Sequence, residues 1–236
     1  MLSTLRRSAL VLGALGMAVG LPQLVLTSLA GQAGAAPGGS LCQLAGTATF
    51  SPNGPGTSTS FAYSLTGTLS GCQSNITGAP ASGSIAVGQV VTEAVTITTS
   101  TGPVAGTAQY QEPLATGTGT VPVNSCPSGA TSGTAVTTWP DGTDTVAGYT
   151  TTSAGAGVNL QGTVVAGVAL QLVAGSESPA GTAPATFTIS SDNAAYPAGA
   201  GVQGVLAFTT SNPQACTTAS GLTDASVQGQ VGLGHT

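Results

Sequence analysis

The stretch FAYSLTGTLS, residues 61–70, alternates apolar or aromatic residues with small polar ones. Alternate side chains of an extended strand point to opposite faces, so this pattern predicts a strand with one buried face. The preceding segment 45–50 is its expected antiparallel partner, joined through a turn at 51–56 that is rich in Pro, Asn and Gly. The buried face of the strand would carry Phe61, Tyr63, Leu65, Gly67 and Leu69.

This hairpin determines where two of the four cysteines meet. Cys42 and Cys72 are equally far from the hairpin midpoint near Thr57, so strand pairing would place them opposite each other. An even number of cysteines in an exported protein indicates disulfides. We therefore expect a Cys42–Cys72 bridge and, by elimination, a Cys126–Cys216 bridge. Metal binding is the alternative, but the four cysteines lack the close pairs that zinc sites use.

Further segments rich in Val, Ile and Thr follow, separated by Gly, Pro, Asn and Ser. About nine or ten such strands with turns between them predict an all-β fold, a single antiparallel sandwich or barrel. The segment 158–173 would be its longest strand, with Val158 and Leu172 on the same face. Segments 74–83 and 112–131 are the expected long loops. The other expected strands are 84–99, 104–111, 134–139, 145–152, 186–190, 202–210 and 225–233.

Composition supports the all-β prediction. Charged residues make up 4% of the chain, against about 25% in ordinary globular proteins. Low charge with high hydrophobicity argues against disorder. Lys, Glu, Arg and Met, which favour helices, are scarce, whereas Thr and Val, which favour strands, are abundant.

The first 35 residues are expected to be a secretory signal peptide. Arg6 and Arg7 precede a nearly apolar run over 8–26, and a small-residue site, Ala33-Gly34-Ala35, follows. Cleavage before Ala36 would leave one all-β domain over 36–236, secreted or associated with the cell envelope. An uncleaved membrane anchor is the alternative, although Pro22 and Gln23 interrupt the apolar run.

Cleavage would remove both basic residues of the chain. The formal charge would change from -5 to -7, because Arg6 and Arg7 are its only cations and the seven acids all lie after residue 35. Nucleic-acid partners and anionic membrane surfaces are therefore excluded as binding partners. No lysine is left for a Schiff base or a phosphate loop, and no arginine for a bidentate clamp on phosphate. We expect no cofactor.

Catalytic chemistry is restricted by the same composition. His235 is the only histidine and is the penultimate residue, so a triad with Ser or Cys lacks a positioned base. Glycoside hydrolysis needs only two carboxylates, and the chain has seven, but none lies in a motif that assigns it a role. We expect no catalytic and no metal-binding residue. The candidate carboxylates are Glu93, Glu112, Asp141, Asp144, Glu177, Asp192 and Asp224.

The string WPDGTD, residues 139–144, is the most distinctive motif and the candidate surface contact. A hairpin tip could present Trp139 to a ligand, with Asp141 and Asp144 binding a cation or a sugar hydroxyl. In the alternative, which we favour, Trp139 anchors the core ahead of a tight turn, because the turn already explains Pro, Asp and Gly. Two acids are fewer ligands than a calcium loop supplies.

The strings TGTLSGC (66–72), WPDGT (139–143) and VQGQVGLG (227–234), together with the signal peptide and the Gly/Thr-rich strands, resemble small secreted all-β proteins of high-GC Gram-positive bacteria. No activity is assigned to that group, so the resemblance implies no functional residues. We expect a non-catalytic extracellular or envelope protein with a binding or structural role and an unknown ligand. The alternative is a carbohydrate-binding module or a carboxylate-based glycoside hydrolase.

Overall fold

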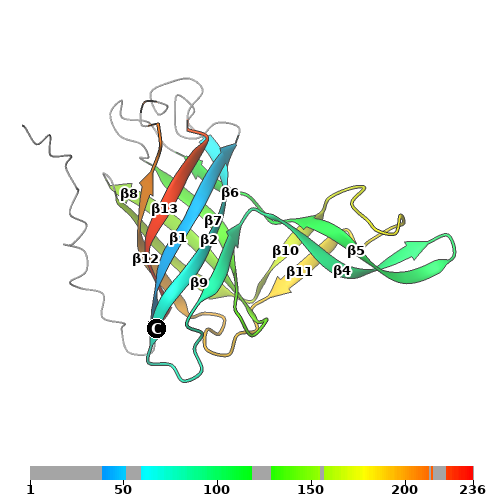
Figure 1. The fold of residues 1–236 in the computed structure, drawn as a ribbon, viewed down its shortest axis with the longest axis horizontal. Coiled ribbons are helices and arrows are strands. Elements are labelled where there is room, and N and C mark those ends of the chain that lie inside the picture. Colours follow the sequence, from blue (N-terminus) through cyan, green and yellow to red (C-terminus); the bar gives the residue numbers. More distant parts are fainter. Residues whose placement is uncertain are drawn as a thin grey trace, which may run out of the picture. The chain divides into compact units, whose positions relative to one another are not determined.

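The computed structural model describes residues 39–51, 60–118, 129–154, 157–212, 214 and 222–235. These residues form thirteen strands in two antiparallel sheets (Figure 1). Within this described part, no helix is long and apolar enough to cross a membrane. The strands are β1 Ser40–Ser51, β2 Ser60–Ser74, β3 Gly83–Val87, β4 Val90–Thr99, β5 Gly102–Gln111, β6 Ala115–Thr118, β7 Ala130–Thr138, β8 Asp144–Ala154, β9 Gly157–Val165, β10 Gly167–Leu172, β11 Thr186–Ser190, β12 Gly201–Thr209 and β13 Asp224–His235.

Eight strands close into an antiparallel barrel in the order β1-β13-β12-β9-β8-β7-β3-β2, with β2 pairing back onto β1. The barrel strands alternate inward apolar residues with outward residues that are mostly Ser, Thr, Gln or Gly, as β2 shows along Phe61–Leu69. Closure leaves no free sheet edge in the barrel. Of the two architectures left open by the sequence, the barrel is the one that forms.

One position in the barrel wall is shared by two short strands. β3 lies between β2 and β7 at one end of the barrel, and β6 lies between the same two strands at the other end. Between them the chain leaves the barrel at Gly88 and returns at Leu114. Gly88 has φ +62°, and a Cβ there would lie 2.8 Å from Cδ2 of Leu114. A glycine is therefore required where the two crossing segments touch.

The chain that leaves the barrel builds a second sheet, in the order β11-β10-β5-β4. Its buried face includes Ile97, Tyr110 and Leu170, which pack in one hydrophobic cluster with Val136 and Val146 on the outer wall of the barrel. β10 pairs with β5 over two residues, and the segment between β10 and β11 adds isolated bridges from Ser178 to Thr107 and from Thr182 to Thr98. The second sheet is thus attached to the barrel over β7 and β8.

The Cys42–Cys72 disulfide is confirmed, with a Cα–Cα distance of 4.0 Å. Along most of the β1–β2 hairpin, Gln43 faces Ser70, a register that would set Cys42 against Gly71. A bulge shifts the register by one residue, and Gly71 takes φ +57° there, which brings Cys72 into line. Cys126 and Cys216 lie outside the described residues, so the second bridge stays a prediction.

Three expected elements differ from the structure. The segment 84–99 is two strands, β3 and β4, because the chain changes sheets at Gly88. The segment 158–173 is also two strands, β9 in the barrel and β10 in the second sheet, so Val158 and Leu172 do not share a face. The expected loop over 112–131 contains β6 and the start of β7. We expected a single sandwich or barrel of about nine or ten strands. The structure instead has thirteen strands, divided between a barrel and a separate four-stranded sheet.

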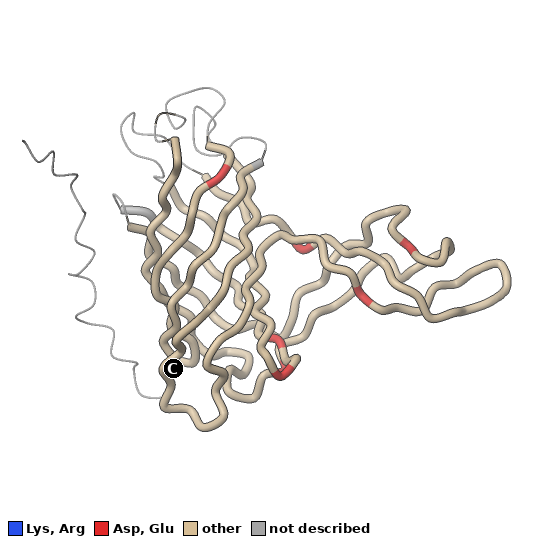
Figure 2. Tube along the Cα trace, in the orientation of Figure 1, with Lys and Arg blue, Asp and Glu red and all other residues tan. Residues whose placement is uncertain are grey.

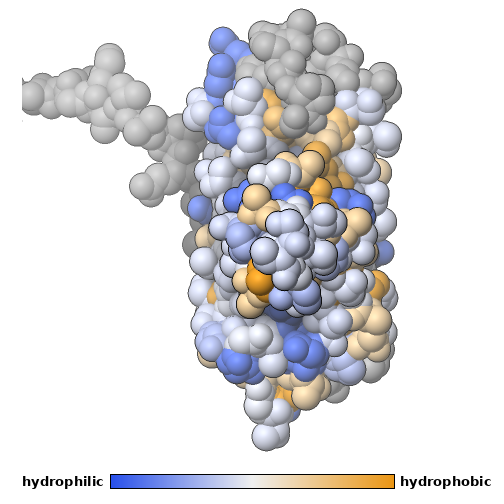
Figure 3. Space-filling model, turned by 90° about the vertical axis from the view of Figure 1, so that its right-hand side faces the viewer, coloured by the Kyte–Doolittle hydropathy of each residue, from blue (hydrophilic) through white to orange (hydrophobic). Residues whose placement is uncertain are grey.

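The outer surface is almost uncharged. Figure 2 shows a few acidic positions and no basic one along the described trace. The face drawn in Figure 3 is mostly pale, with small separate apolar patches. Outward strand residues are therefore mainly Ser, Thr, Gln and Gly, and the large apolar side chains are concentrated inside the barrel.

Candidate functional site in the barrel interior

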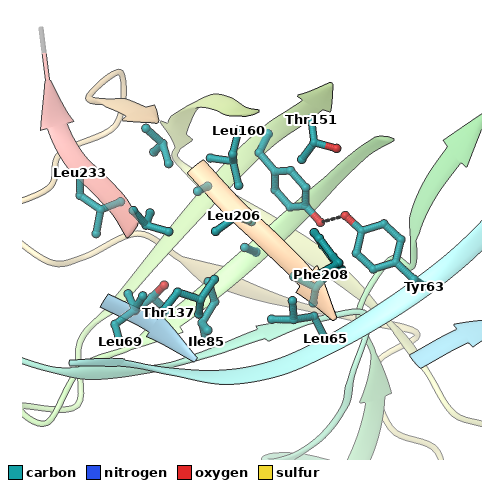
Figure 4. A pocket seen from close by; sticks show the side chains of 17 residues that line it. Tyr63, Leu65, Leu69, Ile85, Thr137, Thr151, Leu160, Leu206, Phe208 and Leu233 are labelled. Carbon is teal, nitrogen blue, oxygen red and sulfur yellow. Dashed lines mark hydrogen bonds between the residues drawn. The ribbon is translucent and has the colours of Figure 1, made fainter. Parts of the chain in front are cut away.

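The barrel encloses a mainly apolar cavity, and Figure 4 shows the side chains that line it. The space left free by the side chains is about 50 Å³, which is small beside the roughly 300–1,000 Å³ of drug-sized ligand pockets. Only four of the lining side chains carry an oxygen atom, and none is charged. The lining residues are Leu44, Tyr63, Leu65, Leu69, Ile85, Val87, Ala135, Thr137, Ala147, Tyr149, Thr151, Leu160, Val202, Leu206, Phe208, Val231 and Leu233.

One end of the barrel is closed by the Trp139–Tyr196 pair, whose ring centroids are 5.2 Å apart. The indole Nε1–H donates to Oγ1 of Thr145 over 2.8 Å, and the Tyr196 hydroxyl donates to Oγ of Ser40 over 2.8 Å. Both rings are almost fully buried. Every polar group of these two side chains is therefore hydrogen-bonded, which makes this end a rigid plug.

Four hydroxyl groups form a chain in the half of the barrel away from the Trp139 plug. The Tyr63 and Tyr149 hydroxyls are 2.7 Å apart, Tyr63 lies 3.1 Å from Oγ1 of Thr131, and Thr131 lies 2.6 Å from Oγ1 of Thr151. In Figure 4 the dashed line joins the hydroxyl of Tyr63 to that of Tyr149, and both rings lie in the wall of the cavity. This hydroxyl chain is the main polar feature of an otherwise apolar interior.

Burial keeps these phenols neutral. Desolvation raises the pKa of Tyr63, and hydrogen bonds from Thr131 and Tyr149 offset part of that effect. Desolvation also raises the pKa of Tyr149 well above its ordinary value, and the neighbouring Tyr63 raises it further. Both raised pKa values favour the protonated, neutral phenols, so the hydroxyl chain is a neutral hydrogen-bonding group at neutral pH.

Some inward-facing side chains keep part of their surface exposed. Ile85, Leu160 and Phe208 point into the barrel and line the cavity, yet each is only partly buried. Phe208 lies close to the Tyr63–Tyr149 pair in Figure 4. Toward the same half of the barrel, the rings of Phe50, Phe61 and Tyr63 pack at 5.8 to 6.4 Å. These partly exposed side chains would have to move to admit a small apolar molecule, because the free space is small.

The structure separates the three residues of the WPDGTD motif. Trp139 is 2% exposed and lies inside the barrel, so the core interpretation holds and the indole is not a surface contact. Asp141 is exposed, and its Oδ1 accepts hydrogen bonds from the side chain and backbone of Thr143, which lower its pKa. The carboxylate of Asp144 accepts a hydrogen bond from the Thr138 hydroxyl. Its pKa is raised, mainly by partial burial and to a smaller extent by the negative charge of nearby Asp192. Both acids therefore serve the turn.

The carboxylates do not gather at a cavity. Neither the interior cavity nor the outer groove described below has Asp or Glu in its wall. Within the described ranges, no three His, Cys, Asp or Glu side chains are grouped as metal ligands. Glu112 lies where the chain returns to the barrel and is 2% exposed. Its Oε2 accepts a hydrogen bond from the backbone N–H of Gln89 over 3.0 Å, whereas its Oε1 is buried without a hydrogen-bond partner.

An open groove of about 810 Å³ lies on the outside of the barrel over β6 to β9. Its polar side chains are hydroxyls and one amide, without charge. The aromatic residue in its wall, Tyr149, turns its ring into the barrel, so no ring is presented to the groove as a platform. The groove residues are Leu114, Thr116, Ser132, Gly133, Thr134, Gly148, Tyr149, Thr150, Gln161, Gly162 and Thr163.

Sequence reasoning did not single out the residues of the interior site. Tyr63 was assigned to a buried face and Tyr149 lay within an expected strand, but the meeting of their hydroxyls depends on barrel closure. A tyrosine on the inward face of a predicted strand was the available signal, because a buried phenol needs a hydrogen-bond partner. Comparison with known protein families, curated proteins and solved structures finds no match to this chain.

Proposed function

We propose that this protein is a non-catalytic binding protein, secreted or held at the cell envelope, that encloses a small apolar molecule in its barrel. The observation that carries the proposal is the apolar cavity with a single chain of hydroxyls in its wall. Eight-stranded barrels are just wide enough to hold one small ligand when their interior side chains leave room. The cavity is small, so binding requires movement of side chains such as Phe208.

Two further observations support this function. The interior is closed at one end by the hydrogen-bonded Trp139 and Tyr196 plug, so a ligand would be shielded from water there. The Cys42–Cys72 disulfide and the signal-like N-terminal sequence are compatible with an extracellular site of action. The resemblance to small secreted proteins of high-GC Gram-positive bacteria agrees with that location and remains part of the proposal.

A cavity-filling substitution tests the proposal. Ala135 is buried and lines the cavity, so Ala135→Leu adds three carbon atoms to the site. Ala45→Leu is the matched control, because Ala45 is exposed on β1. Titration calorimetry of the full mature chain with hexane should show binding to the wild type and to Ala45→Leu, and none to Ala135→Leu. Absence of hexane binding to the wild type, or equal binding to all three, would contradict the proposal.

A second candidate function is carbohydrate binding in the outer groove. It is favoured by the groove's neutral hydroxyl and amide lining, which suits sugar hydroxyls, although no aromatic platform is present. Gln161→Ala should weaken oligosaccharide binding in a glycan-array measurement without affecting hexane binding. Binding that is unchanged by Gln161→Ala and Thr134→Ala together would exclude this groove.

A further inference from the structure

We infer that the ligand of the barrel is an uncharged molecule that carries one hydrogen-bond-accepting oxygen on an apolar body, such as an alcohol, ketone or ester, and is not a carboxylate. This inference rests on the proposed function and names the ligand class of the same site. It follows from the number of hydroxyl protons in the Tyr149–Tyr63–Thr131–Thr151 chain and from the absence of charge around it.

The hydroxyl chain has one hydrogen atom more than it uses. Four hydroxyl groups carry four protons, and three hydrogen bonds join them. Either partner can be the donor in each bond, so rotation of the hydroxyls can move the unused proton along the chain. The two ends are Tyr149 and Thr151, and both line the cavity. One O–H group can therefore be turned toward a ligand without breaking the chain.

The charge of the surroundings excludes an anionic ligand. No lining residue is charged, and the chain after residue 35 contains no lysine or arginine. Burying a carboxylate in an apolar cavity without a cation is strongly unfavourable. The raised pKa values of Tyr63 and Tyr149 keep the hydroxyls neutral, so they do not attract a cation either. A neutral oxygen acceptor is the group that matches one free O–H donor.

The test compares four six-carbon probes: hexane, hexanol, methyl butyl ketone and hexanoate at neutral pH. The double variant Tyr149→Phe/Thr151→Val removes both ends of the hydroxyl chain and keeps the apolar volume. Thr66→Val is the control, because Thr66 is exposed on the outer face of β2. Calorimetric affinities are measured on the full mature chain, and unchanged hexane affinity shows that the cavity of the double variant is intact.

We expect the double variant to bind hexanol and the ketone roughly fivefold more weakly than the wild type, the loss typical of one neutral hydrogen bond. Hexane affinity should not change, and Thr66→Val should behave as the wild type. Hexanoate should bind the wild type at least about tenfold more weakly than hexanol.

The inference and the proposed function fail in different ways. If hexane binds but the double variant loses no affinity for hexanol or the ketone, the hydroxyl chain does not select the ligand and the inference is wrong. The same conclusion holds if hexanoate binds as tightly as hexanol. If no probe binds, the proposed function itself is wrong.

Discussion

At the scale of single residues, the chain must fold without any cation after residue 35. Its buried polar groups are therefore satisfied by neutral partners: Trp139 by Thr145, Tyr196 by Ser40, and Tyr63 by Tyr149. Glu112 is the exception, because one of its carboxylate oxygens is buried without a partner. The chemistry of Glu112 and of the Trp139 plug leads to one prediction each.

The first prediction concerns pH. Burial raises the pKa of Glu112 in the folded protein above the ordinary value of about 4.3 that the unfolded chain keeps. The stabilisation from its protonated form is fully present below that ordinary value and is lost as the pH rises through the folded pKa. The free energy of unfolding, measured with urea, should therefore fall as the pH rises above about 4.

The variant Glu112→Gln should flatten this pH dependence. Some slope will remain, because burial also raises the pKa of Glu93 and Asp144. A wild type whose stability increases as the pH rises above about 4, or a variant with an unchanged slope, would show that Glu112 is not buried as described.

The second prediction concerns the Trp139 plug. Thr145→Val keeps the shape of the side chain but leaves the buried indole N–H without an acceptor. We expect a loss of about 1–3 kcal/mol in the free energy of unfolding. In the Trp139→Phe background no indole N–H exists, so Thr145→Val should cost clearly less there. Equal costs in both backgrounds, measured by urea unfolding, would contradict the hydrogen bond.

At the scale of elements, the sequence predicted most strands but not their division between two sheets. Alternation in 61–70 and the Pro-Asp-Gly turn after Trp139 are local signals, and both predictions are confirmed. The breaks at Gly88 and Ala166 depend on long-range packing, because one strand position is filled by both β3 and β6. The pairing of Cys42 with Cys72 was predicted, whereas the bulge at Gly71 that aligns them was not.

The disulfide gives a prediction at this scale. Cys42 and Cys72 are 30 residues apart, and in the chain-entropy treatment their bridge stabilises the fold by about 3–4 kcal/mol. The double variant Cys42→Ser/Cys72→Ser should lose that amount in the free energy of unfolding, measured with urea.

The disulfide connectivity is a separate prediction. Mass mapping of non-reduced fragments should show Cys126 joined to Cys216. A fragment that links Cys72 to Cys126 would contradict both pairings.

At the scale of the whole molecule, the composition provides apolar side chains for the barrel interior and mostly uncharged polar side chains, with a few acids, for its outer surface. The interior site could not be located from the sequence, because it combines side chains from strands that are distant along the chain, such as Tyr63 on β2 and Tyr149 on β8. The expectations based on charge needed no structure, since the part of the chain after residue 35 has no Lys or Arg and cannot provide a basic surface.

Protease resistance is the prediction for the intact molecule. Trypsin cleaves after Lys and Arg, so the mature chain should resist it even in denaturant. A protease of different specificity should digest the reduced, denatured chain and leave the native barrel largely intact, because its backbone is paired in closed sheets. Rapid digestion of the native oxidised protein by that second protease, followed on a gel, would contradict a closed barrel.

The central claim is that the barrel interior binds a small apolar molecule at its hydroxyl chain. A crystal structure of the mature protein grown with hexanol tests it most directly. The account predicts electron density for hexanol among Leu206, Phe208 and Tyr149, with its oxygen within hydrogen-bonding distance of the Tyr149 or Thr151 hydroxyl. An interior without hexanol, filled by the protein's own side chains, would contradict it.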